Sequence, residues 1–212
     1  MTSGQLLEKL VVSHLSPVAK GSSRWVFECP NEPDLLIKVL KIKLPEHRSR
    51  NIREWWAAAK GRYKLARHLR ELKEYIGVVS RSHDELALHL PAMQRMMPTD
   101  LGFGIAVQAV RDDEERLAPT LKQLLKKQQL TDEMRTALDL FFQRLIASDV
   151  VIGDLHAGNL VYGKTSLDSQ KKFYMVDGLG DSTLIPSRSF FPFLNQDRKK
   201  KSIAKLRRRA GC

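Results

Sequence analysis

The stretch VVIGDLHAGNLVYG, residues 150–163, places an Asp, a His and an Asn between two short runs of apolar residues. The pattern predicts one strand at 150–152 and another at 160–162, with Gly153 opening a loop between them. Polar side chains of this kind rarely interrupt buried strands without a role. Asp154 and Asn159 are therefore expected on a loop framed by strands, as candidates for a functional site.

Length and composition limit the classes of protein to consider. The chain has 212 residues, of which 42% are hydrophobic, and this suits one domain of two small lobes with a buried core. The two cysteines, Cys29 and Cys212, suit neither a disulfide framework nor a CxxC metal site. No apolar run is long enough to span a membrane, and no signal peptide is readable. We expect a cytoplasmic protein without a transmembrane segment.

The formal net charge is +12, and two segments, 48–73 and 188–212, carry the excess. Basic segments attract nucleic acid, an anionic membrane surface or a phosphorylated substrate. A solvated helix face and a soluble tail would have the same composition. Charge alone therefore leaves the partner open.

The remaining pattern predicts strands first and then a mixture of helices and hairpins. Short β-like runs at 10–12, 25–27 and 35–40 predict an antiparallel meander, and apolar residues every three or four positions from Ile52 to Ile76 predict a long helix. The runs 93–97 and 103–110 flank PTDLG and predict a hairpin. A helix is expected to start near Pro119, and another to start after Thr131 as N-cap. A second hairpin through GKTSLDSQKK is expected to lead into a strand at 173–176.

This order of elements resembles the two-lobed protein-kinase-like fold. We expect an α+β protein with a strand-rich N-lobe at about 1–110, a hinge at about 108–118 and a shortened helical C-lobe at about 119–212. Lys38 in LIKVL resembles the strand lysine of kinases that reaches the α- and β-phosphates of ATP, and Glu54 would pair with it. The interval from Asp154 to Asn159 matches the catalytic loop, and GDLHAGNL resembles that loop in small-molecule and sugar kinases. Asp177 in VDGLG occupies the position of the metal-binding Asp.

The resemblance implies phosphoryl transfer from ATP, which depends mainly on positioning and on neutralising the charge of the γ-phosphate. Lys38, fixed by Glu54, would hold the phosphates, and Asp154 would accept the proton of the acceptor hydroxyl. Asn159 and Asp177 would bind Mg²⁺, a cation that favours oxygen ligands. His156 is expected to structure the loop through its ring nitrogens. Further nucleotide contacts are expected from the first turn and the hinge, at Gly21, Ser22, Gln108 and Val110.

Three departures from the kinase pattern bear on mechanism. Gly21 stands alone where kinases have a glycine-rich loop, Ile152 replaces the usual His, and Leu179 replaces Phe. The short stretch after Asp177 favours a small or anionic hydroxyl acceptor, such as a phosphorylated sugar or a lipid-linked compound, over a protein substrate. The same departures leave open a catalytically silent binding module. The basic segments leave open a protein that binds nucleic acid or a membrane surface, in which a residue such as Lys38 would be an ordinary strand lysine whose head reaches water.

Several stretches are similar to the YrbL family, the PhoP regulatory network proteins of bacteria. They are the strand LIKVL, the helix start IREWW, the segment GFGIAVQAVRDDE, the loop around Asn159 and above all VDGLGDSTLIP, which is followed by a basic, aromatic-rich end. The resemblance implies a compact kinase-like protein of the cytoplasm, linked to a regulon that responds to magnesium and envelope stress. It does not imply a defined substrate.

Overall fold

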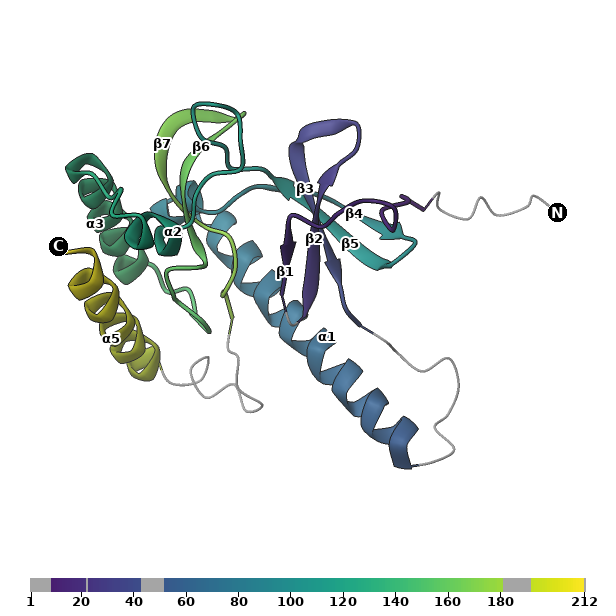
Figure 1. Cartoon of the computed structure of the whole chain (residues 1–212). Coiled ribbons are helices and arrows are strands. Elements are labelled where there is room, and N and C mark those ends of the chain that lie inside the picture. The colour runs from purple at the N-terminus through teal and green to yellow at the C-terminus, as the bar shows by residue number, and fades with distance from the viewer. Residues whose placement is uncertain (1–8, 22, 43–51, 181–191, 212) are drawn as a thin grey trace. The chain divides into compact units, whose positions relative to one another are not determined.

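A computed structural model describes residues 9–21, 23–42, 52–180 and 192–211, with side chains omitted at 52–55, 57, 58 and 192–194 (Figure 1). The fold is mixed α+β. The chain divides into two compact units, one of Met1–Lys64 with Ala92–Ala109 and the other of Leu65–Pro91 with Val110–Cys212. We call them unit 1 and unit 2.

Unit 1 is built on an antiparallel sheet of five strands. They are β1 (Ala19–Lys20), β2 (Arg24–Cys29), β3 (Glu32–Leu40), β4 (Met93–Thr99) and β5 (Gly102–Gln108), in the spatial order β1-β2-β3-β5-β4. The predicted antiparallel pairing of the runs 25–27 and 35–40, as β2 with β3, and the hairpin around PTDLG are confirmed. The predicted strand at 10–12 is wrong, because only Leu10 forms a bridge, to Thr99. The N–H groups of Val12 and Ser13 donate instead to the carboxylate of Asp100, at 2.8 and 3.2 Å.

One face of this sheet carries the core of unit 1. Successive side chains of a strand point to opposite faces, so Leu35, Ile37 and Val39 of β3 are buried together, while Lys38 points to the other face. At Gly104 of β5, an added Cβ would lie 3.1 Å from Cγ2 of Ile37, tighter than an ordinary contact. The sheet is therefore closely packed on the side away from Lys38.

The predicted long helix is confirmed as α1 (Ile52–Val79), which begins in unit 1 and ends in unit 2. Unit 2 then contains the short helices η1 (Glu85–His89) and α2 (Leu121–Lys126), the helix α3 (Asp132–Ala147), the hairpin of β6 (Leu160–Thr165) and β7 (Asp168–Met175), and the helix α5 (Pro192–Ala210). Thr131 is the N-cap of α3 as predicted, since its side chain accepts the N–H of Met134 at 3.2 Å. Thr120 forms a capping box with Gln123 at the start of α2.

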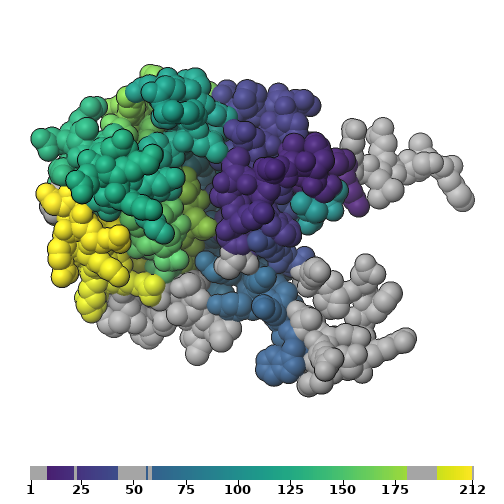
Figure 2. Space-filling model, viewed as in Figure 1, coloured from purple at the N-terminus to yellow at the C-terminus, as the bar shows by residue number. Residues whose placement is uncertain are grey.

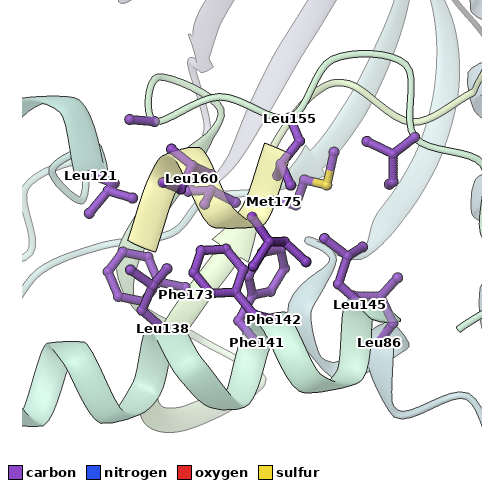
Figure 3. Close-up of a cluster of buried hydrophobic side chains, with 14 of the residues drawn as sticks. Leu86, Leu121, Leu138, Phe141, Phe142, Leu145, Leu155, Leu160, Phe173 and Met175 are labelled. Atoms are coloured by element: carbon purple, nitrogen blue, oxygen red, sulfur yellow. The ribbon is translucent and has the colours of Figure 1, made fainter. Parts of the chain in front are cut away.

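The core of unit 2 lies between α3 and the β6–β7 hairpin (Figure 3). Four apolar residues at helical spacing face inward from α3, and they meet apolar residues of the hairpin and of its neighbours. The α3 residues are Leu138, Phe141, Phe142 and Leu145, and those of the hairpin include Leu160, Phe173 and Met175.

A buried histidine joins three elements of this core. His89 of η1 is fully buried, its Nδ1 lies 2.6 Å from the carbonyl oxygen of Phe173, and Arg144 donates to its Nε2 at 2.9 Å. These partners require the neutral tautomer with the proton on Nδ1. Burial, the largest cause, lowers the pKa of His89 from 6.5 to about 4. The imidazole is therefore neutral and has a structural role, linking η1 to β7 and α3.

Helix α5 was not predicted from the sequence. Its buried positions recur at helical spacing, but two of them are polar, which hides the pattern: they are Asn195, Lys199, Ile203, Leu206 and Ala210. It packs beside α3 in antiparallel fashion, because Gln196 donates to the carbonyl of Ile146 and Arg207 pairs with Asp139 at 2.7 Å. None of the helices in the described part of the chain is both long and apolar enough to cross a membrane.

Candidate functional site

The segment 150–152 is buried but does not form the predicted strand. Ile152 makes one isolated bridge, to Leu179, and most of the backbone groups are satisfied by side chains. The N–H of Val151 donates to Glu74 at 2.9 Å, and the N–H of Val150 donates to the hydroxyl of Ser148 at 3.2 Å. The apolar pattern thus reports burial of the segment rather than pairing with a neighbouring strand.

The loop that follows is held against the segment that carries Asp177. The N–H groups of Gly153 and Asp154 both donate to the carbonyl of Gly178, at 2.9 and 3.1 Å. At one end the N–H of Val176 donates to the carbonyl of Asn159 at 2.9 Å, and at the other Gly180 donates to Val151 at 2.8 Å. Two stretches whose bonded residues are 17 to 29 positions apart are therefore joined by four backbone hydrogen bonds.

Glycine is required where the two stretches come closest. Gly178 has φ +101°, and an added Cβ would lie 2.3 Å from the carbonyl oxygen of Asp154. Gly180 has φ +80°, and its Cβ would lie 3.0 Å from the backbone of Arg70 and Glu71 in α1. The DGLG sequence is thus suited to a close approach of backbones rather than to an ordinary turn.

The polar side chains of the loop bond mainly within it. Asn159 Nδ2 donates to the carbonyl of Asp154 at 3.0 Å, which closes the loop between the two predicted site residues. Gly158 donates to Nδ1 of His156 at 2.9 Å, so a neutral His156 carries its proton on Nε2, 3.7 Å from Oδ2 of Asp154. This geometry fits the structural part that we expect of His156. The Asp154 carboxylate is about half exposed and open to a ligand.

The oxygen donors of Asn159 and Asp177 come from adjacent backbone segments. Oδ1 of Asp177 accepts the N–H of Gly178 at 2.7 Å, whereas Oδ1 of Asn159 accepts no hydrogen bond from the described residues. Among the described residues, no three His, Cys, Asp or Glu side chains form a group that could hold a metal ion. Mg²⁺ usually takes only one or two protein ligands and completes its shell with water and phosphate oxygens. The Asn159–Asp177 pair fits that donor set.

Three polar side chains of helix α5 form hydrogen bonds to the backbone at and just before the start of the loop. Asn195 is 4% exposed, and its amide donates to the carbonyl of Val150 at 2.8 Å and accepts the N–H of Ile152 at 3.3 Å. Arg198 donates to the carbonyl of Gly153 at 2.6 Å, directly before Asp154. These contacts fix the backbone from which Asp154 projects.

The third of these α5 side chains, Lys199, is a buried cation. It is 1% exposed, and its Nζ donates to the carbonyl of Ser148 at 2.6 Å, at the C-cap of α3. Burial lowers the pKa of Lys199 from 10.5 to about 8, although the carboxylates of Asp149, Asp84 and Glu74 oppose the change. A polar side chain at this depth indicates that the loop backbone needs an internal donor.

The site residues predicted in unit 1 lie on its sheet. Lys38 is half-buried in β3, opposite Val26 of β2 and Ile105 of β5. Gly21 lies in the turn between β1 and β2, where its N–H donates to the carbonyl of Arg24 at 2.9 Å and its own carbonyl accepts from Lys41. Ser22 lies outside the described residues. Glu54 belongs to α1, but its side chain also lies outside them.

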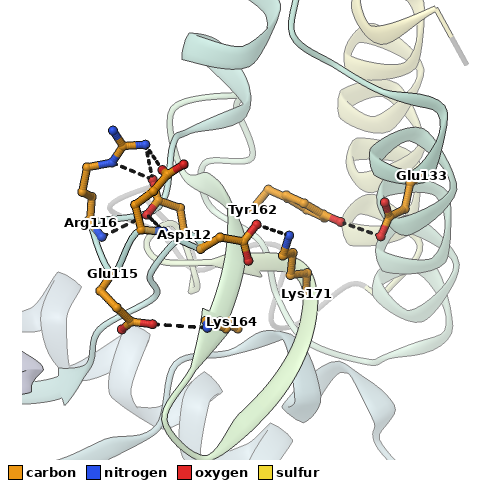
Figure 4. Close-up of polar contacts among 9 residues, drawn as sticks. Asp112, Glu115, Arg116, Glu133, Tyr162, Lys164 and Lys171 are labelled. Atoms are coloured by element: carbon orange, nitrogen blue, oxygen red, sulfur yellow. Dashed lines mark hydrogen bonds and ion pairs between the residues drawn. The ribbon is translucent and has the colours of Figure 1, made fainter.

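The predicted hinge residues are buried and largely bonded within their own units. Gln108 ends β5, and its N–H donates to Ala92 at 2.9 Å; in unit 2, the carbonyl of Val110 accepts from Ala118 at 2.9 Å. The following loop is tied to the β6–β7 hairpin by ion pairs (Figure 4). They include Lys164 with Glu115 at 3.2 Å and Lys171 with Asp113.

The predicted site residues Asp154, Asn159 and Asp177 lie on two backbone segments that are joined in unit 2, but the residues that hold these segments were not predicted. Glu74, Asn195, Arg198 and Lys199 act on backbone groups rather than on a ligand, so they belong to no motif. A signal was present in α5, where Asn195 and Lys199 continue the four-residue spacing of Ile203. Polar residues at the inner positions of a helix are a sign of buried backbone that needs partners.

The comparisons with known proteins identify a family. No curated protein sequence matches the chain. The family model described as "PhoP regulatory network protein YrbL" matches residues 10–211, which is nearly the whole chain and covers every residue of the loop, its partner segment and the three α5 side chains. The chain belongs to the YrbL family of PhoP regulatory network proteins.

Proposed function

We propose that this protein is an ATP- and Mg²⁺-dependent phosphotransferase with a two-lobed protein-kinase-like fold. The observation that carries the proposal is the pairing of the 153–159 loop with the 176–180 segment, because it draws Asp154, Asn159 and Asp177 to one place. Phosphoryl transfer needs an acceptor-orienting carboxylate beside oxygen ligands for Mg²⁺, and these three side chains supply both.

Each residue has a part in the proposed reaction. Asp154 would orient the acceptor hydroxyl and take its proton, as the acceptor oxygen bonds to the γ-phosphorus and the bond to the β–γ bridging oxygen breaks to release ADP. Asn159 and Asp177 would hold Mg²⁺, which neutralises phosphate charge when bound. Lys38 with Glu54 would hold the α- and β-phosphates. Gly21, Ser22, Gln108 and Val110 would contact the nucleotide.

The acceptor in this proposal is a small or anionic compound with a hydroxyl group, such as a phosphorylated sugar or a lipid-linked one. The excess of Lys and Arg in segments 48–73 and 188–212 would raise the local concentration of an anion. That attraction weakens as salt rises, because charges are screened over about 8 Å at physiological ionic strength. A cytoplasmic location, where ATP is available, belongs to the same proposal.

A catalytically silent kinase-like module is the second candidate function. It is favoured by the turn at Gly21, where an added Cβ would meet nothing closer than 3.6 Å, so the backbone there has no special need for glycine. The replacement of His by Ile152 and of Phe by Leu179 points the same way. Such a module would bind nucleotide, or none, and act through contacts in its regulatory network.

The two candidates are separated by ATP consumption. The wild-type chain is incubated with Mg²⁺, ATP and panels of anionic sugars, lipid-linked sugars and generic proteins, with Asp154→Asn as the matched variant. The proposal predicts turnover with an anionic acceptor that falls with added salt and is lost in the variant. Nucleotide binding without turnover on any acceptor would select the silent module, and salt-independent turnover of a neutral protein would contradict the proposed acceptor.

A further inference from the structure

The outer face of α5 carries cations that the fold does not use. The residues of α5 that are exposed and basic are Lys200, Lys201, Lys205, Arg208 and Arg209. We call this set the α5 basic face. On a helix of 3.6 residues per turn, Lys201, Lys205 and Arg208 lie opposite the buried stripe that includes Lys199, Ile203 and Leu206, and Lys200 and Arg209 flank it on the two sides. Figure 2 shows α5, in yellow, uncovered at the surface.

Most of this charge has no carboxylate to balance it. Lys201 pairs with Asp197 at 2.7 Å, which is the one acidic residue of the helix. The other four members of the basic face make no ion pair among the described residues. Arg207, which lies beside the α5 basic face, forms an ion pair with Asp139 of α3.

The arrangement opposes the stability of the helix itself. Lys201 and Lys205 are four residues apart, and Lys205 is three from Arg208, so like charges face each other and destabilise the helix. The helix dipole favours cations only in the last turn. It therefore gives no reason for Lys200 and Lys201, which lie near the middle. A bound polyanion would turn this repulsion into attraction.

We infer that the α5 basic face binds the phosphodiester backbone of a nucleic acid. Lys201, Lys205 and Arg208 form its crest over seven residues, or about 10 Å of helix. One strand of a duplex presents about three phosphates over that length. A row of three cations thus matches three successive phosphates of one strand.

The neighbourhood of α5 favours a linear polyanion over an anionic bilayer. Helix α3, which packs beside α5, has an exposed carboxylate at its start, Asp132, and another follows its end, Asp149. A strand can follow the basic face alone, without covering these acidic neighbours. The exposed part of α5 also offers no large apolar side chain among the described residues for insertion between lipids.

The inference is independent of the proposed phosphotransfer and is tested on the full chain with labelled oligonucleotides of random sequence, single-stranded and duplex. Each phosphate contact adds about 0.9 to the slope of log affinity against log salt on a duplex, and about 0.7 on a single strand. The double variant Lys205→Gln, Arg208→Gln removes two cations of this row and should therefore weaken binding and reduce the duplex slope by about 2. The matched control, Lys126→Gln with Lys127→Gln, removes the same charge from exposed positions at the end of α2 and should leave the slope unchanged.

Three results would overturn the inference. They are no oligonucleotide binding by the wild type at low salt, equal losses in the two double variants, and binding by the wild type to vesicles of phosphatidylcholine and phosphatidylglycerol in preference to oligonucleotides. Circular dichroism of both variants establishes that α5 remains folded, since Gln is compatible with an exposed helix position.

Discussion

Removing the Asn195 side-chain amide is expected to release the loop that carries Asp154. The substitution Asn195→Leu keeps the side-chain size but leaves the carbonyl of Val150 and the N–H of Ile152 without their partner in a buried place. An unsatisfied buried backbone group costs about 1–3 kcal/mol, and the added apolar burial of Leu offsets about 1 kcal/mol of the total. The expected net loss is about 1–5 kcal/mol.

The loss can be measured globally and at the loop. For a chain of this length, 1–5 kcal/mol corresponds to a fall in melting temperature of about 2–20 °C. Hydrogen exchange of the Ile152 amide gives a local measure, because that N–H loses its acceptor. The matched control is Gln196→Leu, which removes a similar bond, to the carbonyl of Ile146, at a position open to water. Water replaces that bond, so the control should lose less than about 1 kcal/mol.

Equal stability losses in the two variants would refute the reasoning, as would unchanged exchange of the Ile152 amide in Asn195→Leu. Either result would mean that α5 covers the loop without holding it. The positions of Arg198 and Lys199 would then need another explanation, because the three side chains reach the same stretch of backbone.

Three further perturbations test other parts of the fold. Burial lowers the pKa of His89 from 6.5 to about 4, so below pH 6.5 the unfolded chain binds a proton that the folded chain does not accept. The free energy of unfolding should therefore fall by about 3 kcal/mol as pH falls from 6.5 to 4. Urea melts should show this fall in the wild type and a flatter dependence in His89→Phe, and an equal slope in the variant would contradict the expectation. Gly178→Ala should cost about 1–3 kcal/mol or more, because its Cβ meets the Asp154 carbonyl at positive φ. Gly77→Ala in the interior of α1, where no atom lies closer than 3.9 Å to the added Cβ, should stabilise by about 0.5–1 kcal/mol. Melting temperatures of both variants above, or both below, that of the wild type would contradict the packing at Gly178. Thr131→Ala should lose about 1 kcal/mol through its N-cap bond at the start of α3, and wild-type stability in a urea melt would argue against that cap.

Periodic elements with caps were predictable from the sequence. The spacing of apolar residues in α1, the turn chemistry between β4 and β5 and the Thr131 cap are local signals, and the local structure follows them. The interval between Asp154 and Asn159 also identified the loop. These features depend on neighbours in the chain, so pattern and structure agree.

The errors occur where bonding is non-local. Val150 and Ile152 have strand propensity, but their backbone groups bond to Ser148 and Asn195 instead of to a strand. Leu10 to Val12 look like a strand, but only Leu10 bonds to a neighbouring backbone, at Pro98 and Asp100, and the N–H of Val12 donates to the side chain of Asp100. No rule of spacing in a single sequence indicates which distant side chain will reach a backbone group.

If Asn159 and Asp177 hold the Mg²⁺ of a nucleotide complex, as proposed, stabilisation by nucleotide should depend on both Mg²⁺ and Asp177. The most direct test is the melting temperature of the wild-type chain and of Asp177→Asn, each with ATP and Mg²⁺, with ATP alone and without ligand. Nucleotide at about 100 times its dissociation constant stabilises a protein by about 2.7 kcal/mol. The account predicts a stabilisation of this size in the wild type that requires Mg²⁺ and disappears in Asp177→Asn, whose melting without ligand stays close to that of the wild type. Equal stabilisation of the two proteins, or none in the wild type, would contradict it.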